Sequence, residues 1–450
     1  MYSGDEKKMS SDRATRADST SNKFARHDPE RVSVSIGDVS ELGLYPRPER
    51  RHFSVLNIVA LSFNICNSWS TIASSLAIAI SAGGPATLIY GILLSVTAYS
   101  ATAASLAELA SCYPTAGGQY HFTSILAPKR FSRGLSYACG SIATFSWIAI
   151  DAAATLLGAQ MLLSIISFYL PSYVPEAWHY FLVYQAIHLV LFLYNLVALV
   201  KTPWVHNLGL LLTLCAFVVI TITCLARSEK RSSEYVWATL DNNTGWPSGV
   251  TFLTGLATPA FMYAGLDASM HLAEECTEPE KTVPRALMAT ILIGFITGFA
   301  FSIAILMHAS LGVPVWALIV EEVVVIICGC IYLGSTAAFN ALINTAVILQ
   351  IISFAIPCAL LLLRGRSERF LAKGRWFCIP GWLGWVCNGI VVVYAVIELV
   401  FFDLPTSIPT TGSSMNYTCA VLATMAVFSG INWLVYARKH YKGPRIDLSS

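Results

Sequence analysis

Long apolar stretches alternate with short polar ones from Phe53 onward. Each stretch holds roughly 20 mostly apolar residues, the length that an α-helix needs to cross a hydrocarbon core about 30 Å thick. The pattern therefore predicts an all-α polytopic membrane protein. Eleven spans are expected, at residues 54–81, 84–110, 134–166, 178–199, 206–226, 250–276, 286–307, 314–334, 338–363, 382–403 and 416–437.

The same pattern divides the chain into three regions. Residues 1–52 are rich in Ser, Asp, Arg and Lys and hold few large apolar side chains, so burial cannot offset the entropy of ordering them. We expect a disordered cytosolic tail there, without the apolar segment that a cleavable signal peptide requires. Residues 53–437 form the predicted transmembrane domain, and residues 438–450 form a cytosolic C-terminal tail.

Two of the predicted spans carry polar residues, Gly or Pro in their middle. The first is interrupted around residues 67–71 (NSWST), and the sixth around residues 258–267 (TPAFMYAGLD). Irregular backbone is tolerated at membrane depth where it lines a cavity. A broken helix presents N–H groups at one end and C=O groups at the other, and these bind anionic and cationic groups respectively. The interruptions therefore predict a site for a charged solute.

Composition indicates that lipid is the solvent for most of the chain. The sequence is 55% hydrophobic and 12% charged, whereas soluble domains carry about 25% charged residues. Residues 1–51 hold 10 of the 28 Lys and Arg and 9 of the 26 Asp and Glu, which leaves 18 basic and 17 acidic residues for the other 399. Without a basic patch and interleaved aromatic residues, nucleic acid is not an expected partner. The 12 Cys are interpreted as small packing residues, with no metal or cofactor site.

Basic residues in the loops predict the orientation, but they also create a conflict. Residues 129–133 follow the second span and residues 281–285 follow the sixth, and the positive-inside rule places both groups in the cytosol. The rule also places residues 364–375 and 438–445 there. Counting the predicted spans, however, puts residues 364–375 outside. One span is therefore missing, or one predicted segment does not cross.

Residues 107–121 (AELASCYPTAGGQYH) give the most specific signal. Glu108 lies near the end of the second span, and Pro114 then ends the helix while the glycine pair allows close backbone packing. The run resembles the amino acid–polyamine–organocation permeases, whose second span ends in a closely similar string. Four further runs resemble the same family, at residues 261–275, 279–286, 313–318 and 331–341.

The resemblance covers roughly residues 50–445 and is nearest to fungal choline and γ-aminobutyrate permeases, because of Asn67-Ser68-Trp69. It implies the inverted-repeat fold of the bacterial leucine transporter, with spans one and six broken at mid-membrane. It also implies transport of an amino acid or related amine by alternating access, with proton symport. The plasma membrane is the implied location, and the vacuolar membrane is the alternative. The sequon at Asn242 fits an outside loop, whereas the one at Asn416 lies outside in the full family topology and the missing span leaves its side open here.

The resemblance further implies where a substrate would bind. Its carboxylate would meet the backbone of the first interruption, and its amine or quaternary ammonium would meet carbonyl groups of the sixth span. The expected residues are Asn67, Ser68, Trp69, Ser70, Thr71, Phe261, Met262, Tyr263, Ala264, Gly265 and Asp267. The aromatic members either attract an onium group by cation–π contact or pack between helices.

Ionisable residues within spans are costly and are functional candidates for that reason. Those expected to act in coupling or gating are Glu108, Asp151, Glu274 and Glu275. The position of Glu108 suits gating or structure better than proton carriage. A hydrogen bond between helices is the alternative role for Asp151, and His188 is interpreted as a packed residue. The adjacent acids Glu321 and Glu322 have no explanation in this scheme.

The chain departs from the family after Met307, where it passes directly to residues 308–314 (HASLGVP). In related permeases a further span lies between these points, so the eighth span is expected to be absent, giving about 11 spans instead of 12. A transport-deficient truncated or sensor-like variant is therefore the second hypothesis. A membrane enzyme is the third, and no nucleophile–base pair, metal cluster or phosphate loop supports it.

Overall fold

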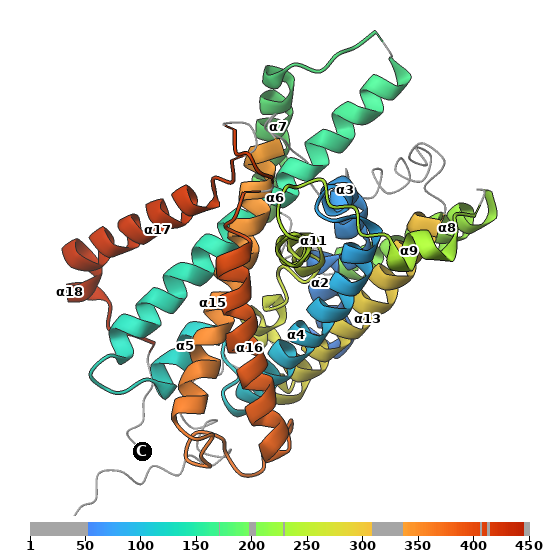
Figure 1. The fold of residues 1–450 in the computed structure, drawn as a ribbon. Coiled ribbons are helices and arrows are strands. Elements are labelled where there is room, and N and C mark those ends of the chain that lie inside the picture. Colours follow the sequence, from blue (N-terminus) through green and yellow to red (C-terminus); the bar gives the residue numbers. More distant parts are fainter. Residues whose placement is uncertain are drawn as a thin grey trace, which may run out of the picture. The chain divides into compact units, whose positions relative to one another are not determined.

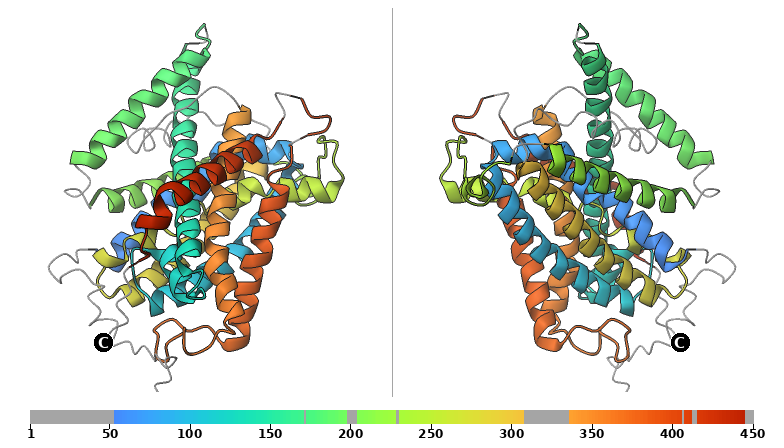
Figure 2. Two further views of the ribbon diagram at one scale, coloured as in Figure 1. Left: turned by 90° about the vertical axis from the view of Figure 1, so that its left-hand side faces the viewer. Right: turned by 90° about the vertical axis from the view of Figure 1, so that its right-hand side faces the viewer.

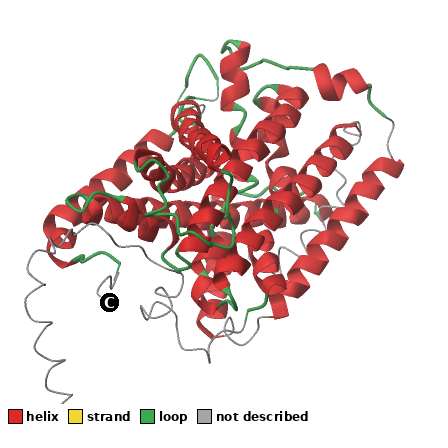
Figure 3. Cartoon of the chain, turned by 90° about the horizontal axis from the view of Figure 1, so that it is seen from below, coloured by secondary structure: helices red, strands yellow, loops and turns green. Residues whose placement is uncertain are grey.

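The computed structural model describes residues 53–170, 172–197, 204–227, 230–307, 336–405, 407–411 and 415–444. Within these residues the chain consists of helices, loops and two isolated β-bridges, Phe53–Cys276 and Gly83–Asp241. Figure 3 shows this part as helices joined by loops. The all-α prediction is confirmed for the described residues, while the predicted N-terminal tail lies outside them.

Figure 1 labels most of the helices along the chain. In order they are α2 (Val55–Cys66), α3 (Ser68–Ser81), α4 (Gly84–Cys112), α5 (Gly118–Leu126), α6 (Ser132–Tyr169), α7 (Ala177–Val197), α8 (Trp204–Arg227), α9 (Ser233–Ala238), α10 (Ser248–Thr254), α11 (Ala257–Phe261), α12 (Ala268–His271), η3 (Ala273–Glu275), α13 (Pro279–Met307), α15 (Thr336–Leu363), α16 (Gly381–Phe401), α17 (Thr418–Asn432), the π-helical turn η4 (Trp433–Ala437) and α18 (Arg438–His440).

Nine stretches in the described ranges are long and apolar enough to cross a membrane. Eight agree closely with predicted spans, and α13 begins seven residues before its predicted start at residue 286. The sixth predicted span, 250–276, is a series of short helices rather than one rod. The predicted span 314–334, with Glu321 and Glu322, lies outside the described residues, so the total of eleven stays a prediction.

The helices differ in how deeply they are buried. In the most apolar stretch of α4, 67% of the residues are buried. Many of them are Ala, Ser or Thr, which allow close packing against α13 and α16. α7 contacts α6, and none of the residues in its most apolar stretch is buried. α7 stands apart in both views of Figure 2, where α15 and α16 run side by side. Apolar helices with so little burial in protein are expected to face lipid.

Basic loops gather on one side of the helices, called the inner side from here on. Arg375 Nη2 lies 2.7 Å from Glu108 Oε1 near the end of α4. Arg133, at the start of α6, donates from Nε to the carbonyl of Tyr441 over 3.0 Å. The loop 364–375 and the C-terminal segment therefore share the side on which α4 ends. This common side agrees with the charge pattern, and its assignment to the cytosol stays a prediction.

On the opposite side, called the outer side, α13 ends and α15 begins. The carbonyl of Met307 accepts a hydrogen bond from the Arg231 amide, in the loop before α9. Near the start of α15, Asn344 Nδ2 donates to the carbonyl of Phe402, just after α16. The side on which α13 ends is thus the side on which α15 begins, and loop 364–375 can then lie inside.

Both sequon asparagines also lie on the outer side, but their side chains are engaged. Asn242 Nδ2 donates to the Trp246 carbonyl, and Asn416 Nδ2 to the Phe402 carbonyl, each over 2.7 Å. Each side-chain oxygen accepts a hydrogen bond from the threonine hydroxyl two residues further on. These asparagines therefore stabilise turns, which is a frequent use of the Asn side chain.

Candidate functional site

The first predicted span is interrupted at Asn67, between α2 and α3. Asn67 has a φ of 34°, a left-handed conformation that ends α2. Its side-chain oxygen accepts from Thr213 Oγ1 over 3.0 Å, and Thr71 Oγ1 donates to the carbonyl of Cys66 over 2.9 Å. The first turn of α3 then leaves amide groups without intrahelical partners, as every helix start does. The local sequence thus provides both the break and the hydroxyls that satisfy its polar groups.

The sixth span is interrupted between α11 and α12. The amides of Tyr263, Ala264 and Leu266 each donate to the carbonyl three residues earlier, so the chain forms tight turns instead of an α-helix. Gly265 has a φ of 85°, and a Cβ atom there would lie 2.4 Å from Ile65 Cγ2. Only glycine meets both conditions, because other residues rarely adopt a positive φ and none lacks Cβ.

The two interruptions meet. Ser68 Oγ, at the start of α3, donates to the carbonyl of Met262 over 2.8 Å. Gly294 of α13 packs against this contact, since a Cβ there would lie 2.5 Å from Ser68 Oγ and 3.2 Å from Tyr263 Cε1. The structure therefore brings together residues of both predicted halves of the substrate site.

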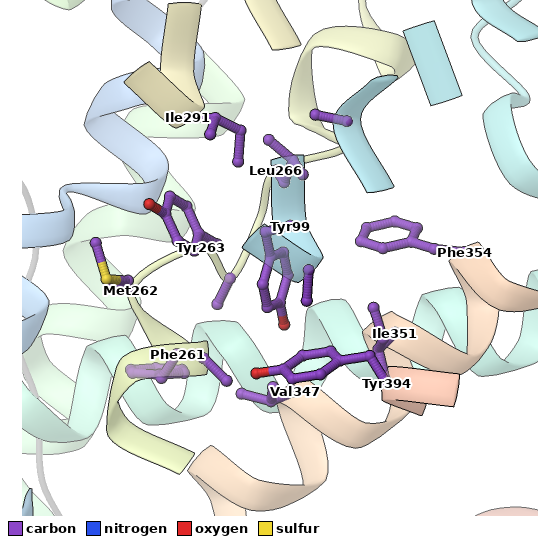
Figure 4. Close-up of a cluster of buried hydrophobic side chains, with 14 of the residues drawn as sticks. Tyr99, Phe261, Met262, Tyr263, Leu266, Ile291, Val347, Ile351, Phe354 and Tyr394 are labelled. Carbon is purple, nitrogen blue, oxygen red and sulfur yellow. The ribbon is translucent and has the colours of Figure 1, made fainter. Parts of the chain in front are cut away.

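Trp69 points away from this meeting point. Its ring packs against Phe217 of α8 and Phe301 of α13, with centroid distances of 6.1 and 5.7 Å, and its Nε1 donates to Thr213 Oγ1. Of the two roles expected for the aromatic residues, these contacts fit packing between helices for Trp69. Tyr263, in contrast, packs with its ring tilted against that of Tyr99 of α4, at 5.2 Å between centroids. Figure 4 shows the two rings side by side.

Asp267 is 1% exposed and is the centre of a hydrogen-bonded cluster. Gln119 Nε2 and Trp147 Nε1 donate to its Oδ2, and Gln350 Nε2 donates to its Oδ1. His271 Nε2 lies 3.1 Å from Oδ2, one helical turn away. Several donors aimed at one carboxylate stabilise its charged form. Asp267 thus links α5, α6 and α15 to the interruption.

Sequence reasoning missed the partners of Asp267, although one signal was present. Gln119 belongs to the run at residues 107–121, which placed it in a conspicuous motif without giving it a partner. Gln350 lies in the apolar helix α15 and also accepts a hydrogen bond from the Gly265 amide over 3.1 Å. A lone polar residue in a span is a candidate in its own right, and this criterion would have found it.

Glu108 is fully buried and joins α4 to the loop before α16. Arg366 pairs with one of its oxygens, while Arg375 and the amide of Ile379 donate to the other. Burial disfavours the charged form of Arg375, but the hydrogen bonds and negative charge of Glu108 outweigh it and hold the pKa of Arg375 above its usual value. This geometry fits the structural or gating role expected of Glu108.

The other predicted coupling residues lie away from the interruptions. Asp151 is 58% exposed at its side chain and lies 3.7 Å from His188 Nδ1, which is 48% exposed, so His188 is not a packed residue. Glu274 Oε1 accepts a hydrogen bond from the Ala116 amide, and Glu275 is exposed. The nearby Lys281 pairs with Glu278.

A third buried carboxyl group was not predicted. Glu398, in the last turn of α16, is 0% exposed, and its Oε1 accepts a hydrogen bond from Tyr99 Oη over 3.4 Å. Tyr394, one turn earlier, contacts Ser95 of α4 through its hydroxyl over 3.0 Å. An acidic residue inside an apolar span was again the available signal.

Comparison with known proteins decides the family. The amino acid permease family model matches residues 53–313 and 307–426, which is most of the chain. The protein belongs to this family. The two matched segments meet at residues 307–313, where the sequence departs from the expected pattern of spans. Membrane transport is the activity that the family supports for this permease.

Named relatives of this permease transport different compounds. A choline transporter of Saccharomyces cerevisiae is 28% identical over 473 aligned positions, covering 87% of this chain and 82% of the relative. The transmembrane transporter swnT of Metarhizium robertsii is 29% identical, covering 88% and 93%. Amino-acid permease 2 of Neurospora crassa is 24% identical, covering 94% and 92%.

The alignments also show that relatives contain residues that this permease lacks. The alignment with the choline transporter has 473 positions, but 87% of 450 residues is only about 390, so about 80 positions of the relative have no counterpart here. A difference of this size is large enough for one span and its loops, since a span needs roughly 20 residues.

Proposed function

We propose that this permease moves a small solute with an amino or quaternary ammonium group, such as an amino acid, choline or γ-aminobutyrate, by alternating access. The observation that carries the proposal is the contact between the two interrupted helices, from Ser68 Oγ to the Met262 carbonyl. Interrupted helices with free backbone ends at membrane depth are the means by which many transporters hold charged solutes.

Each end of this contact suits a different part of such a solute. The first turn of α3 directs amide groups and the positive end of a helix dipole toward the meeting point, which favours a carboxylate or hydroxyl group. The turns around Tyr263 bring carbonyl groups and an aromatic ring, which favour a cationic nitrogen. The names of the choline transporter and the amino-acid permease among the relatives agree with this solute class.

Proton symport at the plasma membrane completes the proposal. Buried carboxyl groups close to the interruptions provide groups able to bind a proton, and the outward sequon turns and inner basic loops fit a cell-surface orientation. The second candidate is a transport-deficient or sensor-like variant, which the roughly 80 missing alignment positions favour.

Uptake in a yeast host that lacks its own choline and amino-acid permeases tests the proposal. Cells carrying the wild-type chain are expected to accumulate labelled choline, γ-aminobutyrate or an amino acid above the empty-vector level. Gly265→Ala is expected to reduce that uptake more than tenfold, because the added Cβ strains a positive φ and clashes with Ile65. Gly249→Ala in α10 is the matched control, since no atom lies within 4 Å of its added Cβ.

A fluorescent tag on the chain separates the two candidates. If the wild-type protein reaches the cell surface in normal amounts and takes up none of these solutes, the transport-deficient variant replaces the transporter as the interpretation. If uptake is present and Gly265→Ala leaves it unchanged, transport does not depend on the interruption of the sixth span.

A further inference from the structure

Glu398 differs from the other buried carboxyl groups in having almost no partners. It lies between α16 and α4 and is 0% exposed. One oxygen accepts the long hydrogen bond from Tyr99, and the other, Oε2, has no hydrogen-bond partner among the residues that the structure describes. A buried polar atom without a partner is costly and calls for an explanation.

The described helices that pack most closely against α16 offer no positive charge to Glu398. The helices packed against α16 are α4, α15 and α10. α15 and α10 contain no Asp, Glu, Lys, Arg or His, and the only such residue of α4 is Glu108 at its inner end. A further acid, Asp403, lies just beyond α16, and burial raises its pKa. An ionised Glu398 would cost several kcal/mol in this environment.

Tyrosine side chains connect Glu398 to the interruption of the sixth span. Tyr99 donates to Glu398, and its ring lies beside that of Tyr263 and, at 5.9 Å between centroids, that of Tyr394. Figure 4 shows these three rings gathered in one cluster. The hydroxyl of Tyr263 is itself buried without a partner. Glu398 is therefore one side chain away from the proposed substrate site.

We propose that Glu398 binds and releases the proton that drives transport by this permease. The inference rests on the proposed function. In the solute-bound state the carboxyl group is neutral and is compatible with its apolar surroundings. When the site opens inward and water reaches Tyr263, Glu398 gives its proton to water and becomes a carboxylate. Tyr99 then donates to that carboxylate, and its ring moves relative to Tyr263.

Glu398→Gln is the decisive variant, because glutamine copies the shape of the protonated side chain and cannot release the proton. The purified full chain is reconstituted into lipid vesicles, and labelled choline and γ-aminobutyrate are tested separately. Two rates are measured: net accumulation driven by an imposed pH gradient, and exchange of labelled for unlabelled solute across a membrane without a gradient. Asp403→Asn is the matched control.

Glu398→Gln is expected to lose net accumulation by at least tenfold and to keep exchange within about twofold, because exchange needs no net proton movement. Asp403→Asn is expected to behave as wild type in both. If Glu398→Gln keeps gradient-driven accumulation, or loses exchange as well, Glu398 is not the proton carrier. If the wild-type chain performs neither reaction with either solute, the proposed function itself fails, and this inference fails with it.

Tyr99→Phe provides a second test that does not depend on the folding of Glu398→Gln. Removing the hydroxyl removes the donor that bonds to Glu398 Oε1 and favours its charged form, so the carboxyl group stays protonated to a higher pH. The external pH at which uptake is half-maximal is therefore expected to move upward by about half a unit or more. An unchanged or lower half-maximal pH contradicts the proposal.

Discussion

Glu108 and Glu398 are both fully buried carboxyl groups in contact with α4, and their surroundings are opposite. At the inner end of α4, two arginines and a backbone amide surround Glu108. In the outer half, Glu398 has only the tyrosines Tyr99 and Tyr394 beside it, and its Oε2 has no hydrogen-bond partner in the described part of the chain. The first arrangement compensates a negative charge, and the second leaves one uncompensated. Partners, rather than burial alone, therefore separate a structural carboxylate from one suited to carry a proton.

Asp267 is an intermediate case that clarifies the comparison. It is as buried as the other two, but neutral donors from Gln119, Trp147 and Gln350 surround it, together with His271. Hydrogen bonds alone can hold a carboxylate in its charged form when enough donors converge on it. The cluster ties the interruption of the sixth span to three other helices.

The largest expected effect follows from removing the charge of Glu108. Glu108→Gln leaves Arg366 and Arg375 largely buried without a counter-charge, and breaking such a pair costs roughly 3–5 kcal/mol. Glu398→Gln is expected to change stability by less than about 1 kcal/mol, because it replaces a neutral group with a neutral group. Thermal unfolding of both proteins in detergent checks the difference. Equal losses of stability would remove the basis of the comparison.

A smaller effect is expected from displacing one arginine of the Glu108 cluster without touching the carboxylate. A Cβ atom at Gly384 would lie 2.1 Å from Arg366 Nη2, so Gly384→Ala must push this guanidinium away from Glu108. Overpacking of this kind costs roughly 1–3 kcal/mol. Gly389→Ala on the same helix is the control, since nothing lies within 4 Å of its added Cβ. In the same thermal assay, Gly384→Ala should unfold at a clearly lower temperature than Gly389→Ala.

The smallest effect is expected at Asp267, where several donors share the task. Gln350→Leu removes one donor and also leaves the Gly265 amide without its acceptor, at a cost of about 1–2 kcal/mol. Trp147→Phe removes only a 3.3 Å hydrogen bond and should cost less. Unfolding midpoints of the two variants test this order. A loss at Gln350 as large as that of Glu108→Gln would mean that Asp267 depends on a single partner.

Local features of the sequence predicted much of this protein correctly. Apolar length identified the helices that the structure describes, because the thickness of the hydrocarbon core fixes the length of a span. Asn67 and Gly265 marked both interruptions, because left-handed backbone favours exactly such residue types. The run at residues 107–121 predicted the family, and the family comparison confirmed it.

Other features could not be predicted because they concern groups far apart in the chain. Asp151 was expected to act in coupling or gating, with a hydrogen bond between helices as the alternative, and the structure places its Oδ2 3.7 Å from His188 Nδ1 of α7. Trp69 lies next to the break and still packs against α8 and α13. Spacing along a helix gives the direction of a side chain relative to its neighbours, and it does not say which helix lies in that direction.

The sequence by itself determined that this chain is a membrane permease with two interrupted spans, because apolar length, turn residues and family motifs are all local. Only the tertiary structure decided which acids are charged pairs and which are isolated. The arginines that surround Glu108 come from 258 and 267 residues further along the chain, and the tyrosine beside Glu398 comes from 299 residues earlier. The packing of helices decides these contacts, and with them the electrostatic free energy of each buried group.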